Sequence, residues 1–137
     1  MKTARIGSLS LIALAALAVG CSSATEYEVT GEVTSSSTIS DPISLEFFEL
    51  DGADTEAERE SVHTFELAEL GAFTQTVEAS EGYKVIVHAL VDSDKDGKCT
   101  EGELWAEVEL TPTAEATLDA ATLNLSAAAC PTAATSE

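Results

Sequence analysis

The sequence predicts a single all-β domain, an antiparallel β-sandwich of about seven short strands. Apolar and polar residues alternate with a period of two along most of the chain, as in strands that bury one face. Glycine, proline and acidic turn residues interrupt this alternation at short intervals. No long apolar stripe has the period of a helix. Short strands separated by frequent turns favour a sandwich.

The first half of the domain contains four of the expected strands. The first alternates Tyr, Val and Gly with Glu and Thr, and the second begins directly after Pro42. The third alternates more loosely, and Gly71 breaks the chain before the fourth. Between the second and third strands, we expect the acidic segment 54–60 to form one helical turn. These four strands are expected at residues 27–33, 43–47, 62–67 and 73–77.

Three further strands are expected in the second half of the domain. Residues 83–91 have apolar side chains on both faces, with Ile86 and Leu90 opposite the main apolar set, so this strand should be central in its sheet. The next strand places Trp105 on the face opposite its apolar residues. We expect Trp105 to cover the end of the sandwich, with stacking on a ligand as the alternative. The last two strands are expected at residues 104–110 and 118–125.

Four segments in this order resemble a known family. They read Val-Thr-Gly-Glu-Val at 29–33, Pro-Ile-Ser-Leu at 42–45, Gly-Ala-Phe-Thr at 71–74 and Glu-Gly-Tyr-Lys-Val-Ile-Val at 81–87. Together they resemble the carboxypeptidase-regulatory-like, or transthyretin-like, β-sandwich, a fold with the general plan of an immunoglobulin domain. The resemblance covers about residues 26–91. It implies a non-catalytic structural, adhesive or accessory module and leaves the strand order after residue 91 open.

The N-terminal segment has the pattern of an export signal. Lys2 and Arg5 precede an uncharged apolar run at residues 9–19, which is shorter than the about 20 residues that a membrane-spanning helix needs. Small residues then lead to Cys21, which resembles the lipidation site of bacterial lipoproteins. Ala18 departs from that family pattern, which has leucine at this position. The alternative is an ordinary secretory signal that precedes an unrelated cysteine.

This pattern predicts how the chain is divided and where the protein resides. Residues 1–20 would be the signal peptide, 21–25 the lipidated Cys21 and a tether, 26–125 the sandwich, and 126–137 a flexible tail. Membrane attachment would come from acyl chains on Cys21, since stable anchoring takes more than one chain. Serines rather than aspartate follow Cys21, which in Gram-negative lipoproteins favours the outer membrane. The expected location is therefore the cell envelope.

The chain is strongly acidic. Without residues 1–20 it has four Lys or Arg against 25 Asp or Glu, a net charge of −21. Such a charge repels nucleic acids and anionic lipid surfaces, so we expect no nucleic-acid partner. The acids are spread along the whole chain, which favours a role in solubility over a surface that collects cations.

The two remaining cysteines, Cys99 and Cys130, predict a disulfide. Outside the cytoplasm an even pair of cysteines is typically oxidised. The bond would tie the alanine-rich tail to the middle of the domain and stabilise the fold by about 3–4 kcal/mol in the chain-entropy treatment. The alternative is two free thiols, with Cys99 filling a loop position that is usually apolar.

Residues 92–103 have the spacing of a calcium-binding loop. Ca²⁺ prefers about six to eight oxygen ligands, and a twelve-residue loop supplies them from fixed positions around a glycine turn. Here loop positions one, three and five are aspartate, position six is glycine, and position twelve is glutamate: Asp92, Asp94, Asp96, Gly97 and Glu103. This segment resembles an EF-hand loop and predicts Ca²⁺ as the cofactor. The alternative is a solvated acidic turn.

Two further residues complete the expected ligand set. Lys98 would offer its backbone carbonyl at position seven, and Thr100 would act at position nine directly or through water. The flanking segments alternate like strands, whereas a true EF-hand has helices that swing on binding. We therefore expect a strand–loop–strand site that stabilises the fold, with a dissociation constant of about 10⁻⁴–10⁻³ M.

Catalysis is not expected. His63 and His88 each stand alone in a strand, where histidine is more often packed or exposed than catalytic. The sequence lacks nucleophile-elbow, zinc-protease and phosphate-loop motifs. We expect a lipid-anchored, calcium-stabilised binding or structural module with an unidentified protein or glycan partner. The alternatives are a metal-free accessory lipoprotein of a larger envelope complex and, least favoured, a glycan hydrolase that uses paired carboxylates.

Overall fold

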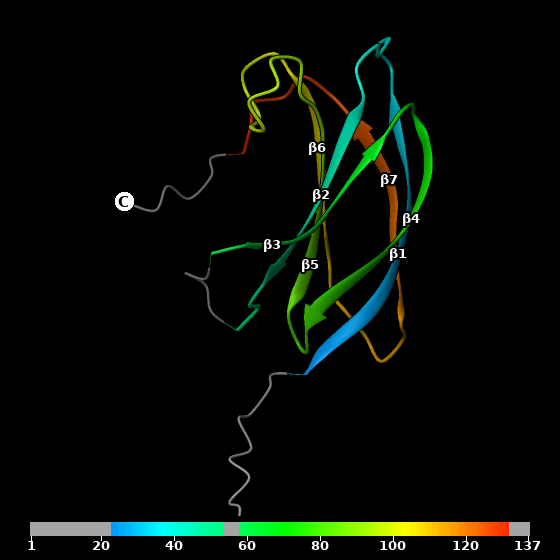
Figure 1. The fold of residues 1–137 in the computed structure, drawn as a ribbon, viewed down its shortest axis with the longest axis vertical. Helices are drawn as coiled ribbons and strands as arrows, with labels where there is room; N and C mark the ends of the chain where they lie inside the picture. Colours follow the sequence, from blue (N-terminus) through cyan, green and yellow to red (C-terminus); the bar gives the residue numbers. More distant parts are fainter. Residues whose placement is uncertain (1–22, 54–57, 132–137) are drawn as a thin grey trace, which may run out of the picture.

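The computed structural model describes residues 23–53 and 58–131, which form a two-layer β-sandwich (Figure 1). The expected signal peptide and Cys21 lie outside the described residues, as does most of the expected helical turn, residues 54–57. Each of the seven expected strands is present. Their bounds are β1 (Ala24–Ser35), β2 (Ile43–Leu50), β3 (Glu60–Leu67), β4 (Gly71–Ser80), β5 (Lys84–Val91), β6 (Leu104–Leu110) and β7 (Thr117–Leu125).

The strands form a three-stranded sheet in the order β4-β1-β7 and a four-stranded sheet in the order β3-β2-β5-β6. The all-β sandwich that the sequence predicts is therefore confirmed, with one difference in strand direction. The pairing of β1 with β7 is parallel, whereas the other paired strands are antiparallel. After β6 the chain crosses to the other sheet, and the amide of Glu28 in β1 binds the carbonyl of Ala116 just before β7. The two strands therefore run in the same direction from a common end.

The hydrophobic core lies between the two sheets. Ile43, Leu45 and Phe47 on β2 are fully buried, and they form one core cluster with valines of β1, β4 and β5. The ring of Phe47 meets that of Phe73 edge to face, with centroids 6.3 Å apart. Phe73 in turn covers Gly31 of β1, where an added Cβ would lie only 2.8 Å from the ring carbon Cζ. Glycine at this position lets the aromatic ring pack directly on the backbone.

Strand β5 is central, as its two apolar faces predict. It pairs with β2 on one side and β6 on the other. Its inner side chains join the core, and Ile86 and Leu90 on the outer face are each only 5% exposed. Burial on the outer face means that other groups of the chain cover this sheet from the solvent side.

The start of β1 and the loop after β5 lie at opposite ends of the sandwich. Ala24 pairs with Ser80 at the end of β4, and the Ser23 hydroxyl lies 3.4 Å from the carboxylate of Glu81 in the turn before β5. Strand β5 then runs away from this turn to the loop at residues 92–103, drawn in yellow-green at the top of Figure 1. The described part of the chain contains no helix long and apolar enough to cross a membrane.

Candidate metal centre

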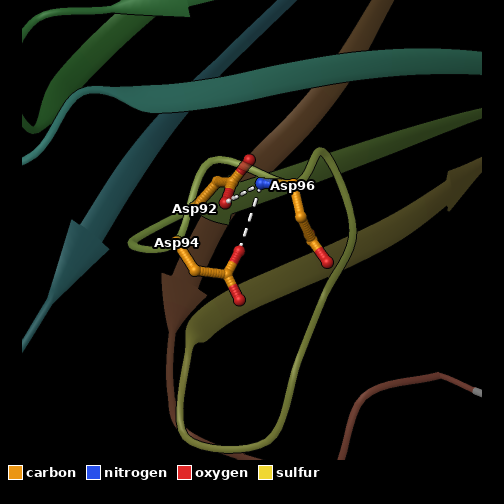
Figure 2. A group of neighbouring side chains, drawn as sticks. All are labelled: Asp92, Asp94 and Asp96. Atoms are coloured by element: carbon orange, nitrogen blue, oxygen red, sulfur yellow. Dashed lines mark hydrogen bonds between the residues drawn. The ribbon is translucent and has the colours of Figure 1, made fainter.

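Three aspartates gather in the loop between β5 and β6. Asp92, Asp94 and Asp96 each offer a carboxylate oxygen, and these oxygens lie within 4.8 Å of one another (Figure 2). The backbone makes this possible by turning sharply inside the loop, where Lys95 has φ 61° and Gly97 has φ 75°. Glycine adopts such positive φ values without steric cost, which is why the sixth loop position calls for it.

Backbone amides hold the three carboxylates in place. The amide of Asp96 donates to Asp92 Oδ1 at 3.2 Å and to Asp94 Oδ1 at 3.1 Å, the two dashed lines of Figure 2. The amide of Gly97 donates to Asp92 Oδ2 at 2.8 Å, and that of Lys98 donates to Asp96 Oδ1 at 2.8 Å. The loop thus orients its acidic side chains through its own backbone.

The spacing of the aspartates fits a divalent ion. Oxygens bound to one Ca²⁺ at about 2.3–2.6 Å lie at most about 5 Å apart, and the three clustered oxygens meet this limit. Each carboxylate oxygen has about two lone-pair sites, so an oxygen that accepts an amide can still ligate an ion. The donor set is all carboxylate oxygen, which suits hard cations. The cluster could therefore hold a metal ion, although it does not by itself select calcium.

Glu103, the expected twelfth-position ligand, lies at the end of the loop beside the aspartate cluster. Its side chain is buried, with 7% exposure, and is bound by the backbone of the loop. Oε1 accepts the amide of Ser93 at 2.7 Å, and Oε2 accepts the amide of Thr100 at 2.9 Å. Glu103 is not one of the three clustered residues, but it closes the loop by joining its second position to its ninth.

The remaining two expected ligands take part in the same hydrogen bonds. Lys98 and Thr100 contribute their amides, to Asp96 and Glu103 respectively. The carbonyl oxygen of Thr100 lies 3.2 Å from Cys130 Sγ. The structure therefore brings three of the six expected ligands together and places the other three within the loop's hydrogen-bond network.

The acidic side chains have different proton affinities. Desolvation acts to raise the pKa of Asp92, but the amides of Gly97, Lys95 and Asp96 together outweigh it and lower that pKa. The pKa of Asp94 is raised: the Asp96 amide acts to lower it, but desolvation and repulsion from Asp96 and Glu103 outweigh that bond. The pKa of Glu103 is lowered, chiefly by its hydrogen bond from the Thr100 amide. Repulsion among the carboxylates is what a bound cation would relieve.

A disulfide joins Cys99 in the loop to Cys130 after β7, as the sequence predicts, with Cα atoms 5.7 Å apart. The segment that leads to Cys130 has further attachments on β6. Trp105 and Ser126 exchange two backbone hydrogen bonds of 3.1 Å, and Trp105 Nε1 donates to the carbonyl of Ala128 at 3.0 Å. These contacts hold the chain in place as far as Cys130, and residues 132–137 lie outside the described residues.

A second polar cluster lies on the outer face of the four-stranded sheet, and sequence reasoning missed it. Glu107 on β6 binds Arg59 Nη1 at 2.7 Å and His88 Nδ1 at 3.0 Å. The hydrogen bond to His88, together with Arg59, lowers the pKa of Glu107. The His88 ring stacks on Trp105 with centroids 5.8 Å apart, while the guanidinium of Arg59 lies 5.2 Å from the ring centroid of Phe48. Trp105 therefore lies against His88 and the segment after β7.

The register of β5 and β6 was the signal that could have revealed this cluster. If the first and twelfth loop residues face each other, as joint ligation of one ion implies, the pairing continues outward from Asp92 and Glu103. His88 then falls opposite Glu107, which is the pairing observed. His63, the other histidine, has no such role; its Nε2 lies 3.1 Å from Gln75 Oε1 and its ring packs on Phe47.

Comparisons with known proteins do not identify the chain. No protein-family model matches it, and searches of curated proteins and of solved structures found no significant match. Any functional argument therefore comes from the residues and geometry of this chain.

Proposed function

We propose that this protein is a lipid-anchored β-sandwich of the cell envelope that calcium stabilises, with a binding or structural role and no catalysis of its own. The observation that carries the proposal is the convergence of Asp92, Asp94 and Asp96 in a loop with calcium-ligand spacing. These residues stand at the first, third and fifth positions, and Gly97 makes the turn that this spacing needs.

Calcium suits this loop better than the other common divalent ions. The cluster contains no imidazole or thiolate, the ligands that favour zinc and copper, and Cys99 is committed to a disulfide. Magnesium demands a near-ideal octahedron at about 2.0–2.1 Å, whereas calcium tolerates irregular arrangements of oxygens at longer distances. A loop whose carboxylates already accept backbone amides offers an irregular set of this second kind.

The position of the loop makes the ion a structural tie. Asp92 follows the central strand β5, and Glu103 precedes the edge strand β6, so a bound ion would fasten the ends of two paired strands. With strands on both sides of the loop, there are no flanking helices to swing when the ion binds. Calcium would then stabilise the folded state by mass action without remodelling it.

The lipid anchor rests on the N-terminal sequence, and the fold is compatible with it. The apolar run and Cys21 precede β1, which starts at the end of the sandwich opposite the aspartate loop. An anchor at Cys21 would place this loop about one strand length, roughly 25 Å, farther from the membrane than the start of β1. Calcium in the surrounding medium would reach it freely.

Titration of the isotope-labelled protein with calcium tests the metal site directly. The amides of Asp96, Gly97 and Lys98, which bind the aspartate cluster, should shift in a saturable way with a midpoint of about 10⁻⁴–10⁻³ M. Asp94→Ala should abolish the saturable shifts. Glu101→Ala removes an acid from the same loop but leaves the cluster intact, so this variant should titrate like the unchanged protein. Similar loss in both variants, or no saturation at all, would reject the site.

Expression in a bacterial host with a radiolabelled fatty acid tests the anchor. The unchanged protein should incorporate label and partition into membranes, and Cys21→Ser should do neither. A secreted, unlabelled product from the unchanged sequence would reject the anchor and leave the metal proposal standing.

A further inference from the structure

The outer face of the four-stranded sheet carries an open cavity of about 790 Å³. Its floor includes the apolar side chains of Phe48 on β2 and of Ile86 and Leu90 on β5. Residues of the aspartate loop, Gly97 and Lys98, line it together with Pro131. The volume falls within the range of about 300–1,000 Å³ that is usual for ligand-binding pockets. We call this cavity the outer groove.

The outer groove is elongated along the strands. Its lining on the β5 side extends from Ile86 to Asp92, six residues apart, which at about 3.3 Å per residue is roughly 20 Å. An open groove of this length matches an extended segment of about six residues better than a compact small molecule. Because β5 is hydrogen-bonded to a strand on each side, the floor is a rigid part of the sandwich.

The charges that line the outer groove favour a basic ligand. Five carboxylates line it against two cationic side chains, Arg59 and Lys98. Two of the five are already paired, Glu107 with Arg59 and Glu109 with Lys84. Glu46 lies in register with His88 across the β2–β5 pairing and has no hydrogen-bond or ion-pair partner among the described residues. Anionic ligands would be repelled. The lining carboxylates are Glu46, Glu58, Asp92, Glu107 and Glu109.

Arg59 shows how a cationic side chain lies on this face. Its guanidinium rests near the ring of Phe48 and ends on the carboxylate of Glu107. The charged end thus lies beside an aromatic ring and meets an acid, an arrangement that long basic side chains adopt on apolar surfaces. Glu46 offers the same chemistry, a carboxylate beside apolar neighbours, to a side chain from another molecule.

We propose that the outer groove binds an extended peptide segment of a partner protein in which arginine or lysine stands beside apolar residues. The apolar side chains would lie against Phe48 and Leu50, which are half-buried, and a basic side chain would pair with Glu46. The groove adjoins the aspartate cluster, because Asp92 belongs to both, but Glu46 and the apolar floor lie outside the cluster. Calcium binding and peptide binding can therefore fail independently.

Binding of matched hexapeptides tests this proposal. Residues 23–137 contain all seven strands and both cysteines of the disulfide, so this form retains the whole sandwich. The probe alternates leucine and arginine; one control alternates glycine and arginine, and another alternates leucine and glutamate. Binding is followed through the fluorescence of Trp105, the single tryptophan, which stacks on groove residue His88. Salt of about 0.15 M screens non-specific attraction to the acidic protein.

The leucine–arginine peptide should bind with saturation, and both control peptides should bind at least about tenfold more weakly. Glu46→Gln should weaken binding by about tenfold, as loss of a charged hydrogen-bond partner predicts. Glu78→Gln on β4 of the other sheet removes the same charge from an exposed position and should leave affinity within about twofold. Equal binding of the glycine–arginine peptide, or equal losses in the two variants, would overturn the proposal, because attraction would then follow net charge alone.

The titrations are repeated in chelator and in calcium. Peptide binding that persists in chelator supports a groove that is formed by the sandwich itself. Absence of binding in both conditions overturns the groove proposal, whatever the calcium titration of the aspartate loop shows.

Discussion

Removal of the Cys99–Cys130 disulfide should cost a large part of the stability of this domain. The bond closes a segment with a sequence separation of 31 residues. In the chain-entropy treatment, a loop of this length removes about 12 cal/mol/K from the unfolded chain, or about 3–4 kcal/mol at 25 °C. The free energy of unfolding of a native protein is about 5–15 kcal/mol in total, so loss of the disulfide should remove a large fraction of it.

The double variant Cys99→Ser, Cys130→Ser provides the measurement. Urea unfolding of this variant and of the oxidised protein, followed by circular dichroism in chelator, gives the two free energies of unfolding. The slope against urea should rise in the variant, because an unfolded chain without the cross-link exposes more surface. Trp105 still binds Ser126 and Ala128 in the folded variant, so the native tail should stay in place.

A difference below about 1 kcal/mol with an unchanged slope would refute this reasoning. It would mean that the unfolded chain is compact around this segment even without the bond. The reduced form of the unchanged protein is the matched control, since it lacks the bond but keeps both sulfur atoms. It should behave like the double variant.

Two further changes test the packing and the electrostatics of the sandwich. Gly31→Ala forces a methyl group against the Phe73 ring and should lower the free energy of unfolding by about 1–3 kcal/mol. The control variant is Ala72→Gly, at the exposed residue that precedes Phe73, and it should lower the free energy of unfolding by less than about 1 kcal/mol. Glu107 has a folded-state pKa below its ordinary value of 4.5, so its contribution is present above about pH 4.5 and is lost as the pH falls through the folded-state pKa. Urea midpoints should therefore fall more steeply between about pH 5 and 3 in the unchanged protein than in Glu107→Gln; equal slopes would contradict the assigned pairing.

The strands were predictable because local alternation decides them. Most strands have an apolar inner face and a polar outer face, so a period of two can be read from the chain without knowledge of its partners. The central position of β5 was predictable for a related reason, since Ile86 and Leu90 on its second face must also be buried. The disulfide followed from an even pair of cysteines and an expected oxidising compartment.

The direction of β7 was not predictable from its own residues. Its alternation is the same whether it runs parallel or antiparallel to β1. Direction depends instead on the crossing between the sheets after β6, which the six residues 111–116 make at the end where β1 begins. Sequence patterns describe the faces of a strand but not the sheet that it joins.

The candidate metal centre was predictable in part. The loop spacing correctly predicted that Asp92, Asp94 and Asp96 lie close together, because short side chains on a tight turn can point in few directions. The longer Glu103 has more freedom and binds two backbone amides of the loop. The Arg59 contact with Glu107 was beyond prediction, because it joins residues of β6 and the segment before β3, which lie on opposite edges of one sheet.

Thermal unfolding in chelator, calcium and magnesium tests the central claim most directly. With a dissociation constant of about 10⁻⁴–10⁻³ M, calcium at about 5 mM should stabilise the domain by about 1–2 kcal/mol. For a domain of this size, that corresponds to a rise in melting temperature of about 4–10 °C. The rise should be absent in Asp94→Ala, retained in Glu101→Ala and much smaller with magnesium. A melting temperature that is the same in chelator and in calcium would contradict the calcium site and leave residues 92–103 as an acidic turn.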